Sequence, residues 1–202
     1  MFDVLIIGGG VSGMSCALVL GSAHKKPYAT DKKIGIFTHQ KNTNLQEALF
    51  NNAYGIAPGT LGADLMTLSI AHLSGQYPDV VQIAGEKVLK IERTDAHFTV
   101  TTNRNSYQSA VVVVAVGWAN TLMIEGLESY IEPHKKSIPE KNRIQLRNTD
   151  HKVADGLYVC GTLSGKRSQL AIAAGSGAEV ATDILTLWND GNQSQSHDSV
   201  KK

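Results

Sequence analysis

The N-terminal part of the chain alternates apolar runs with polar breaks in a pattern that predicts a strand, a helix and a second strand. The apolar run over residues 2–7 is typical of a strand that is buried on both faces. After the glycines at 8–10, apolar residues recur at helical spacing up to about Ala23. The polar stretch over 24–33 then precedes a short apolar strand over 34–37. This order forms a βαβ unit, whose crossover is almost always right-handed.

The middle of the chain predicts one helix followed by several strands. Residues 38–62 are polar and irregular. A helix is expected over about 63–74, with one face directed towards a core: Leu65, Met66, Ser69, Ile70 and Leu73. Segments typical of strands follow over 80–83, 86–92, 98–102 and 107–116. The turns at 94–95 and 103–105 predict that some of these strands form a small antiparallel meander, which returns to the main sheet.

The last part of the chain predicts a crossing segment, a strand and a long helix. Residues 120–155 are mixed in character and contain two prolines, so we expect them to be extended. A strand over 156–160 precedes an alanine-rich helix over about 169–188. The polar tail over 189–202 is expected to be disordered. The pattern as a whole predicts one α/β domain over 1–188, with a parallel sheet.

The composition is that of one ordinary globular domain. The chain has 202 residues, of which 42% are hydrophobic and 18% are charged. Its formal net charge of +1 gives no reason to expect nucleic acid or an anionic membrane as a partner. The longest apolar run, over 110–116, is far shorter than the roughly 20 residues that a membrane span needs. Asp3 and the early glycines are unlike a secretion signal.

The cysteines and histidines indicate neither a disulfide framework nor a metal site. Cys16 and Cys160 lie far apart without a CxxC spacing, so we expect a cytoplasmic protein. Both cysteines are expected to be small core residues, and a redox role for Cys160 is the less favoured interpretation. The 7 histidines are scattered without the spacing of metal ligands, so no metal is expected. No spacing identifies a catalytic acid, base or nucleophile.

Gly8, Gly10 and Gly13 form a GxGxxG motif between the first predicted strand and the first predicted helix. The first glycine permits the tight turn, the second lets the backbone approach a pyrophosphate, and the third lets the helix pack closely on the strand. The helix N-terminus, which begins with Val11 and Ser12, offers free amides and a partial positive charge to that pyrophosphate. The motif in this position predicts dinucleotide binding.

The end of the second predicted strand lacks the acid that usually binds the adenosine ribose about 20 residues beyond the motif. The strand ends in Phe37-Thr38-His39, and Asp31 precedes it and so lies at the wrong end. The alternatives here stay open. In the first, Thr38 or His39 binds a ribose hydroxyl. In the second, His39 and Lys41 favour a 2′-phosphate, so that the chain binds NADP directly. In the third, His39 belongs to a solvated loop.

Further segments follow in the order typical of a known flavoprotein family. They are Asn52-Ala53-Tyr54-Gly55, Val114-Ala115-Val116-Gly117, Gly156 to Thr162, and Gln169 with Ala173, Gly175, Gly177 and Ala181. With the glycine motif, they make the chain resemble the FAD-binding half of the thioredoxin-reductase-like flavoproteins, in the pyridine nucleotide-disulfide oxidoreductase family. The resemblance covers residues 1–117 and 142–188. It implies a three-layer, Rossmann-like FAD-binding domain with a parallel central sheet and a small antiparallel β-meander.

The resemblance also implies that the chain binds FAD non-covalently and that the flavin is the redox centre of an oxidoreductase. The glycine motif would hold the pyrophosphate, the second strand would approach the adenosine, and the turn after the last strand, with the start of the last helix, would serve the ribityl chain and pyrimidine. The residues implied at the cofactor are Gly8, Gly10, Val11, Ser12, Gly13, Phe37, Thr38, His39, Asn52, Val88, Ala115, Gly117, Gly161, Thr162, Gln169, Leu170 and Ala171.

Three departures from the family pattern bear on function. Gly117 and Gly156 are separated by only 38 residues, which hold neither the family's second, NADPH-binding unit nor its CxxC. Thr162 stands where the family has an aspartate, so a charge-assisted hydrogen bond is lost. Apart from these departures, Lys166-Arg167, before the last helix, either neutralises the charge of a flavin or phosphate or forms a solvated basic loop.

These departures lead us to expect a flavin that is reduced by an external donor, either a partner protein or free NAD(P)H. The alternative is a non-catalytic nucleotide-binding module or subunit. An exposed flavin on so small a domain is also a reason to expect a homodimer or a partner contact.

Overall fold

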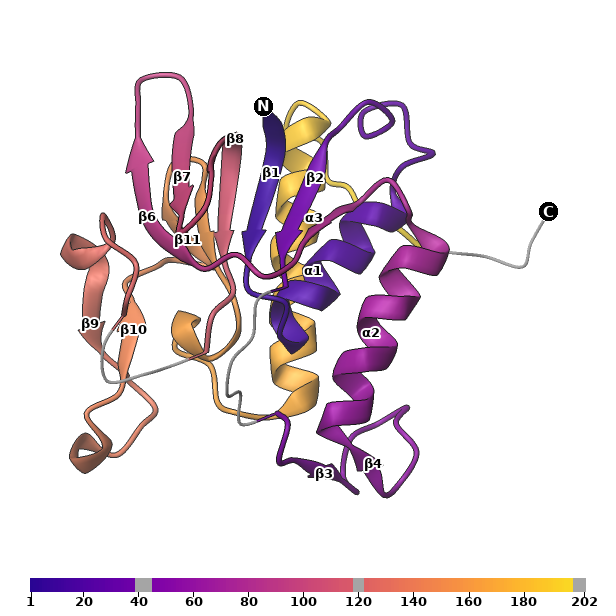
Figure 1. Ribbon diagram of the computed structural model, residues 1–202, viewed down its shortest axis with the longest axis vertical. Coiled ribbons are helices and arrows are strands. Elements are labelled where there is room, and N and C mark those ends of the chain that lie inside the picture. Colours follow the sequence, from indigo (N-terminus) through magenta and orange to yellow (C-terminus); the bar gives the residue numbers. More distant parts are fainter. Residues whose placement is uncertain (39–44, 118–121, 198–202) are drawn as a thin grey trace.

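A mostly parallel sheet forms the centre of the protein, with helices on one face and a β-meander on the other (Figure 1). The computed structural model describes residues 1–38, 45–117 and 122–197. The strands of the main sheet are β1 (Phe2–Ile7), β2 (Ile34–Phe37), β5 (Val81–Ile83), β6 (Val88–Arg93), β7 (Phe98–Thr102), β8 (Ser106–Val114), β11 (Lys152–Ala154) and β12 (Leu157–Val159). They confirm the expected α/β class.

The order of the strands is β11–β12–β8–β1–β2–β5. The strands from β12 to β5 pair in parallel, and β11 is antiparallel to β12. β6 and β7 extend from β8 as an antiparallel meander, so this prediction is confirmed. β5 lies outside the meander and forms the parallel edge next to β2.

Both faces of β1 are buried, as its continuous apolar run predicts. Val4 and Ile6 belong to the core shared with the helices α1 (Val11–Ser22) and α3 (Leu170–Trp188). Leu5 and Ile7 belong to the second core, beneath the meander. The burial of both faces makes the three layers.

The helix α3 packs very closely against α1. A Cβ atom on Gly177 would lie 1.9 Å from the backbone oxygen of Ser12. Ser15 Oγ donates a hydrogen bond to the Ala174 carbonyl at 2.8 Å. By length and composition alone α3 could cross a membrane, but core helices of soluble proteins pass the same test. The full burial of Val180 and Ile184 in the helix-side core identifies α3 as a core helix of this fold.

The helix α2 (Gly62–Gln76) differs from the expectation in how little of it is buried. Of the five residues predicted to face a core, Leu73 is fully buried, whereas Ile70 is 43% exposed. Leu65, Met66 and Ser69 are half-buried. The helical period was predicted correctly, but α2 lies at the margin of the molecule beside α1 (Figure 1), so its predicted core face is only partly covered.

The segment before β12 is more structured than an extended crossing. β9 (Ile131–Pro133) pairs with β10 (Ile144–Leu146) in antiparallel orientation, with single 3₁₀ turns at Glu128–Tyr130 and Pro139–Lys141. Pro133 ends a strand and Pro139 begins a turn, positions where a missing N–H is tolerated. Leu127 and Leu146 anchor the segment in the meander-side core.

Two other polar segments contain local order. The two-residue strands β3 (Leu49–Phe50) and β4 (Thr60–Leu61) pair before α2. After α3, where we expected disorder, the backbone N–H of Ser194 donates to Thr186 Oγ1 at 3.1 Å. Ser22 Oγ donates to Ser196 Oγ at 2.8 Å, so this part of the tail returns to α1.

A nearly buried carboxylate holds the meander together. Glu86 accepts side-chain hydrogen bonds from Thr102 Oγ1 at 2.6 Å, Asn105 Nδ2 at 2.8 Å and Tyr107 Oη at 2.8 Å. The hydrogen bond from Thr102 is the main reason that the pKa of Glu86 is lowered. The Tyr107 ring contacts Phe37 edge-on at 5.5 Å between centroids, so Glu86 also supports the end of β2.

Because folding lowers the pKa of Glu86, the free energy of unfolding depends on pH in the acidic range. A carboxyl whose pKa is lowered by folding contributes stability above its unfolded pKa and loses that contribution as the pH falls through its folded pKa. We therefore expect Glu86→Gln to be less stable than the wild type at pH 7, with a difference that shrinks towards about pH 3. Urea denaturation at several pH values measures it. A difference in unfolding free energy that does not change with pH would contradict the lowered pKa of Glu86.

Candidate cofactor site

The carboxyl ends of β1, β2, β8 and β12 meet at one edge of the sheet because these strands are parallel. The helices α1 and α3 also begin at this edge (Figure 1). In open α/β sheets, ligands bind at this edge, outside the carboxyl ends of the strands. The residues that follow the four strands therefore define the candidate site.

The loop after β1 has a geometry that requires glycine at two positions. Gly8 has φ +115°, and a Cβ atom there would lie 2.7 Å from the Ala115 carbonyl oxygen. A Cβ atom on Gly13 would lie 1.9 Å from the Gly8 carbonyl oxygen. These close approaches hold the start of α1 against the ends of β1 and β8.

The space over the same loop fits a phosphate group. A Cβ atom on Gly10 or Gly117 would meet no atom of the described residues within 4 Å. The first hydrogen bond of α1 runs from the Met14 N–H to the Gly10 carbonyl at 2.8 Å. The N–H groups of Val11 and Ser12 precede that bond, so they remain able to donate to a ligand.

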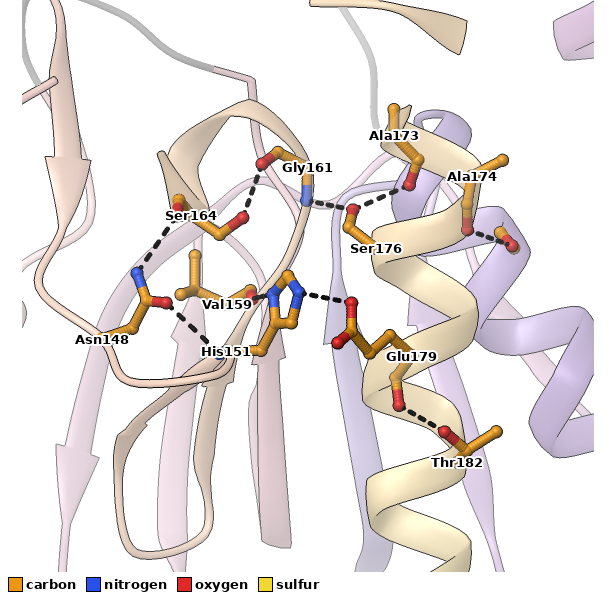
Figure 2. A network of polar contacts seen from close by, with 11 residues as sticks. Asn148, His151, Val159, Gly161, Ser164, Ala173, Ala174, Ser176, Glu179 and Thr182 are labelled. Carbon is orange, nitrogen blue, oxygen red and sulfur yellow. Dashed lines mark hydrogen bonds and ion pairs between the residues drawn. The ribbon is translucent and has the colours of Figure 1, made fainter. Parts of the chain in front are cut away.

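The turn after β12 is tied to the first part of α3 by a chain of hydrogen bonds (Figure 2). The Gly161 N–H donates to Ser176 Oγ at 2.8 Å, and Ser176 Oγ donates to the Ala173 carbonyl at 2.8 Å. Ser164 Oγ donates to the Gly161 carbonyl at 2.7 Å. Gly161 has φ +72°, and a Cβ atom there would lie 2.6 Å from Ser12 Oγ, so this turn also touches α1.

The start of α3 offers a second set of backbone donors. Gln169 is the N-cap residue, and its carbonyl accepts the first helical hydrogen bond from the Ala173 N–H at 2.9 Å. The N–H groups of Leu170 and Ala171 precede that bond and point out of the helix start. Together with the helix dipole, they make this end of α3 favourable for negative charge.

A buried histidine that the sequence did not single out fixes α3 beside β12. His151 is 1% exposed and has φ +68°. Its Nδ1 donates to the Val159 carbonyl at 2.9 Å, and its Nε2 lies 3.1 Å from a carboxylate oxygen of Glu179 on α3 (Figure 2). No spacing signals this contact in the sequence, because it joins a turn to a helix 28 residues later.

The structure places most of the predicted residues at this one edge. Gly8 to Gly13, Ala115, Gly117, Gly161, Thr162 and Gln169 to Ala171 follow the strand ends or begin the helices. Phe37 ends β2, and the Thr38 N–H donates to the Ile83 carbonyl at 3.0 Å. Val88 shares the meander-side core with Phe37. Their roles towards a cofactor stay predictions.

Asn52 is exposed in the connection between β3 and β4, and its proposed nearness to a flavin stays a prediction. His39, with its alternative partner Lys41, lies outside the described residues.

The two cysteines are buried within the helix-side core. Burial raises the pKa of the Cys160 thiol to about 12 and raises the pKa of Cys16 well above its usual value. Both side chains therefore remain thiols at neutral pH, as expected of small core residues.

Comparison with known proteins decides the family. The sequence matches the pyridine nucleotide-disulphide oxidoreductase family over residues 2–175. The chain belongs to this family. Its members are FAD-binding flavoproteins, so the expected family, fold class and cofactor are confirmed at this level.

Individual relatives agree with this assignment. A ferredoxin–NADP reductase from Levilactobacillus brevis is 28% identical over 116 residues, which are 57% of this chain and 34% of the relative. The chain thus spans about a third of the length of that curated relative. A putative thioredoxin reductase from Bacillus anthracis has a TM-score of 0.70 at 14% identity, covering 94% of this chain and 99% of that one. A thioredoxin reductase from Gloeobacter violaceus has a TM-score of 0.70 at 13% identity, covering 98% of each chain. At such identities the structural likeness shows the fold.

The open space at Gly10 leads to a prediction that separates cofactor binding from folding. We expect Gly10→Val to fold and to lose bound flavin, because the added side chain enters open space that a pyrophosphate would fill. Absorbance after purification measures retention, and circular dichroism measures folding. Gly75→Val is the matched control, because Gly75 also faces open space but lies in α2. Retention of flavin by Gly10→Val would show that the loop is structural only.

The contacts of His151 predict a loss of stability on truncation. His151→Ala leaves the Val159 carbonyl without its ring donor and creates a cavity beside α3, which costs about 2–4 kcal/mol of unfolding free energy. The exposed His72 on α2 is the control, and His72→Ala should change stability by less than about 0.5 kcal/mol. Urea denaturation compares the variants. Equal stabilities for both would contradict the positioning role.

Proposed function

We propose that the chain is an FAD-dependent oxidoreductase whose flavin is reduced by an external donor, either free NAD(P)H or a partner protein. The observation that carries the proposal is the open cradle over Gly10 beside the N–H groups of Val11 and Ser12, which have no hydrogen-bond acceptor among the described residues. A cradle of this form suits a pyrophosphate, and the family binds FAD.

The residues of the chain would bind and orient the cofactor, and FAD would supply the redox chemistry. The amides of Val11 and Ser12 would hold the pyrophosphate, and Thr38 would approach the adenosine. The amides of Leu170 and Ala171 would face the pyrimidine, where the positive end of α3 stabilises negative charge on a reduced ring.

The connection between β8 and β12 supports the need for an external donor. In the resembled family, a second nucleotide-binding unit lies at this place in the chain. Here the described residues of the connection form turns, β11 and the β9–β10 pair, without a helix between parallel strands. A dinucleotide-binding half of the βαβ kind needs such a helix.

A second candidate function follows from Thr162. It stands where the resembled family has an aspartate, and a neutral hydroxyl gives a weaker hydrogen bond than a carboxylate. This favours a non-catalytic nucleotide-binding module as the alternative. Direct binding of NADP depends on His39 and Lys41, which lie outside the described residues.

We also propose a cytoplasmic location and a homodimer. A cytoplasmic location rests on two cysteines that are free and buried. A homodimer rests on the expectation that a flavin on a small domain needs cover. Light scattering that finds a monomer with a fully protected flavin would count against the dimer.

The visible spectrum of the purified protein tests the proposed function. We expect absorbance at about 450 nm that bleaches anaerobically with NADPH or NADH, because a flavin loses this band on reduction. Bleaching only with a reduced partner protein would support the protein donor. Colour that no donor bleaches would favour the binding module. A colourless protein that takes up no added FAD would overturn the proposal.

A further inference from the structure

An open cavity of about 300 Å³ lies between the β9–β10 hairpin and the loop that leads into α3. We call it the basic pocket. Half of the side chains that line it are cations, and no carboxylate of the described residues lines it. The cations and hydroxyls of the lining are Lys136, Lys141, Arg143, Arg167, Ser137 and Ser168.

The cations of the basic pocket are not neutralised within the part of the chain that the structure describes. Lys136, Lys141 and Arg167 form no ion pair with a described carboxylate. Glu140, which adjoins Lys141 in the sequence, is exposed and does not line the pocket. Like charges that converge on one cavity repel each other, so an anion between them lowers the electrostatic energy. The ligand that the lining favours is therefore negatively charged.

Buried side chains fix the hairpin side of the pocket. Gln145 is 2% exposed, and its Oε1 accepts from the Lys135 N–H at 2.9 Å while its Nε2 donates to Glu132 at 2.8 Å. Glu132 also pairs with Lys135 Nζ at 2.9 Å, so this acid is engaged by two partners. The Lys136 N–H donates to Nδ1 of His134, which is 4% exposed, at 3.1 Å. The backbone that carries Lys136 is thus held from below.

The two sides of the pocket are joined to each other. His134 Nε2 donates to the Thr162 carbonyl at 3.0 Å, which links the hairpin to the turn after β12. Gly165, in the loop before α3, has φ +84°, and a Cβ atom there would lie 2.6 Å from Gln145 Oε1. The loop therefore packs directly on β10, and the cavity is formed before any ligand binds.

The residues of the lining select the class of anion. Arg143 and Arg167 carry planar guanidinium groups, whose forked N–H donors match the oxygens of a phosphate group. Ser137 and Ser168 add hydroxyl donors for further oxygens. Gln169, the N-cap residue of α3, also lines the pocket, so a ligand there lies near the positive end of this helix. A phosphate monoester carries about −1.5 to −2 charges at pH 7, which suits four cations better than the single charge of a carboxylate.

The size of the pocket leaves room beyond the phosphate group. A volume of about 300 Å³ is at the lower end of the range for small-molecule sites. Ile138 is the apolar residue of the lining and is 57% exposed. It offers a contact for an organic group that the phosphate carries.

We propose that the basic pocket is a binding site for the phosphate group of a small molecule. The inference goes beyond the proposed function, because the site needs neither FAD nor an electron donor. Free inorganic phosphate and a phosphate monoester share this chemistry, and the titrations below separate the two sources.

Calorimetric titration of the FAD-loaded protein with inorganic phosphate tests the proposal, because bound FAD occupies the glycine loop. The pocket variant is Lys136→Ala/Arg167→Ala, and both side chains are exposed, so folding should persist. We expect the affinity for phosphate to fall about 10- to 100-fold, as for the loss of charge-assisted hydrogen bonds. The control Lys25→Ala/Lys26→Ala removes the same charge from exposed residues after α1 and should bind phosphate normally.

A second titration uses phenyl phosphate, a monoester with an apolar body. Tighter binding of phenyl phosphate than of inorganic phosphate assigns the site to a monoester. Ile138→Ser should then remove the difference and leave the binding of inorganic phosphate unchanged, because Ile138 contacts the organic part alone. Equal binding of the two probes by the wild type assigns the site to free phosphate.

Three results would overturn the proposal. The first is equal binding of phosphate by the pocket variant and the wild type. The second is binding of acetate as tight as that of phosphate at equal ionic strength, which would show a diffuse positive surface without a site. The third is a wild type that binds neither phosphate probe, but binds NADPH or an acidic peptide in a way that the pocket variant loses.

Failure of the proposed function gives a different result. If the protein takes up no FAD, phosphate can also bind the glycine loop, so the titration is repeated with Gly10→Val. Binding that persists in Gly10→Val and is lost when Lys136→Ala/Arg167→Ala is added supports the basic pocket even without a flavin. Binding that is lost in Gly10→Val alone would overturn it.

Discussion

The close approach of backbones at the sheet edge is the constraint on which the rest of the structure depends. A Cβ atom on Gly13 would lie 1.9 Å from the Gly8 oxygen, and one on Gly177 would lie 1.9 Å from the Ser12 oxygen. These contacts bring the start of α1 against β1 and bring α3 against α1 in turn. Because the three elements approach so closely, the N–H groups that begin α1 lie beside the space over Gly10 that no described residue fills.

Side-chain hydrogen bonds then fix the positions of the elements around that edge. The Gly161–Ser176 hydrogen bond and the His151–Glu179 pair fix α3 relative to β12. His134 connects the segment after β9 to Thr162 by a hydrogen bond at 3.0 Å. The glycine loop and the start of α3 thus lie at the same edge of the sheet, and both offer backbone N–H groups to a negatively charged ligand.

The sequence was sufficient for features that depend on local pattern. The runs over 2–7 and 34–37 predicted β1 and β2 because strands buried on both faces are apolar throughout. The β9–β10 hairpin, the limited burial of α2 and the role of His151 were not predictable in this way. They depend on contacts between residues far apart in the chain, such as Gln145 against Gly165 or His151 against Glu179. The sequence alone leaves two interpretations of Lys166-Arg167, and the structure places Arg167 in the lining of one cavity with Lys136 and Lys141, while its role stays a prediction.

The central claim is that the glycine loop holds the pyrophosphate of FAD. A crystal structure of the protein with FAD tests it most directly. The account predicts pyrophosphate oxygens over Gly10, within about 3.2 Å of the N–H groups of Val11 and Ser12. A pyrophosphate that lies away from this loop, with no phosphate oxygen in reach of those amides, would contradict it.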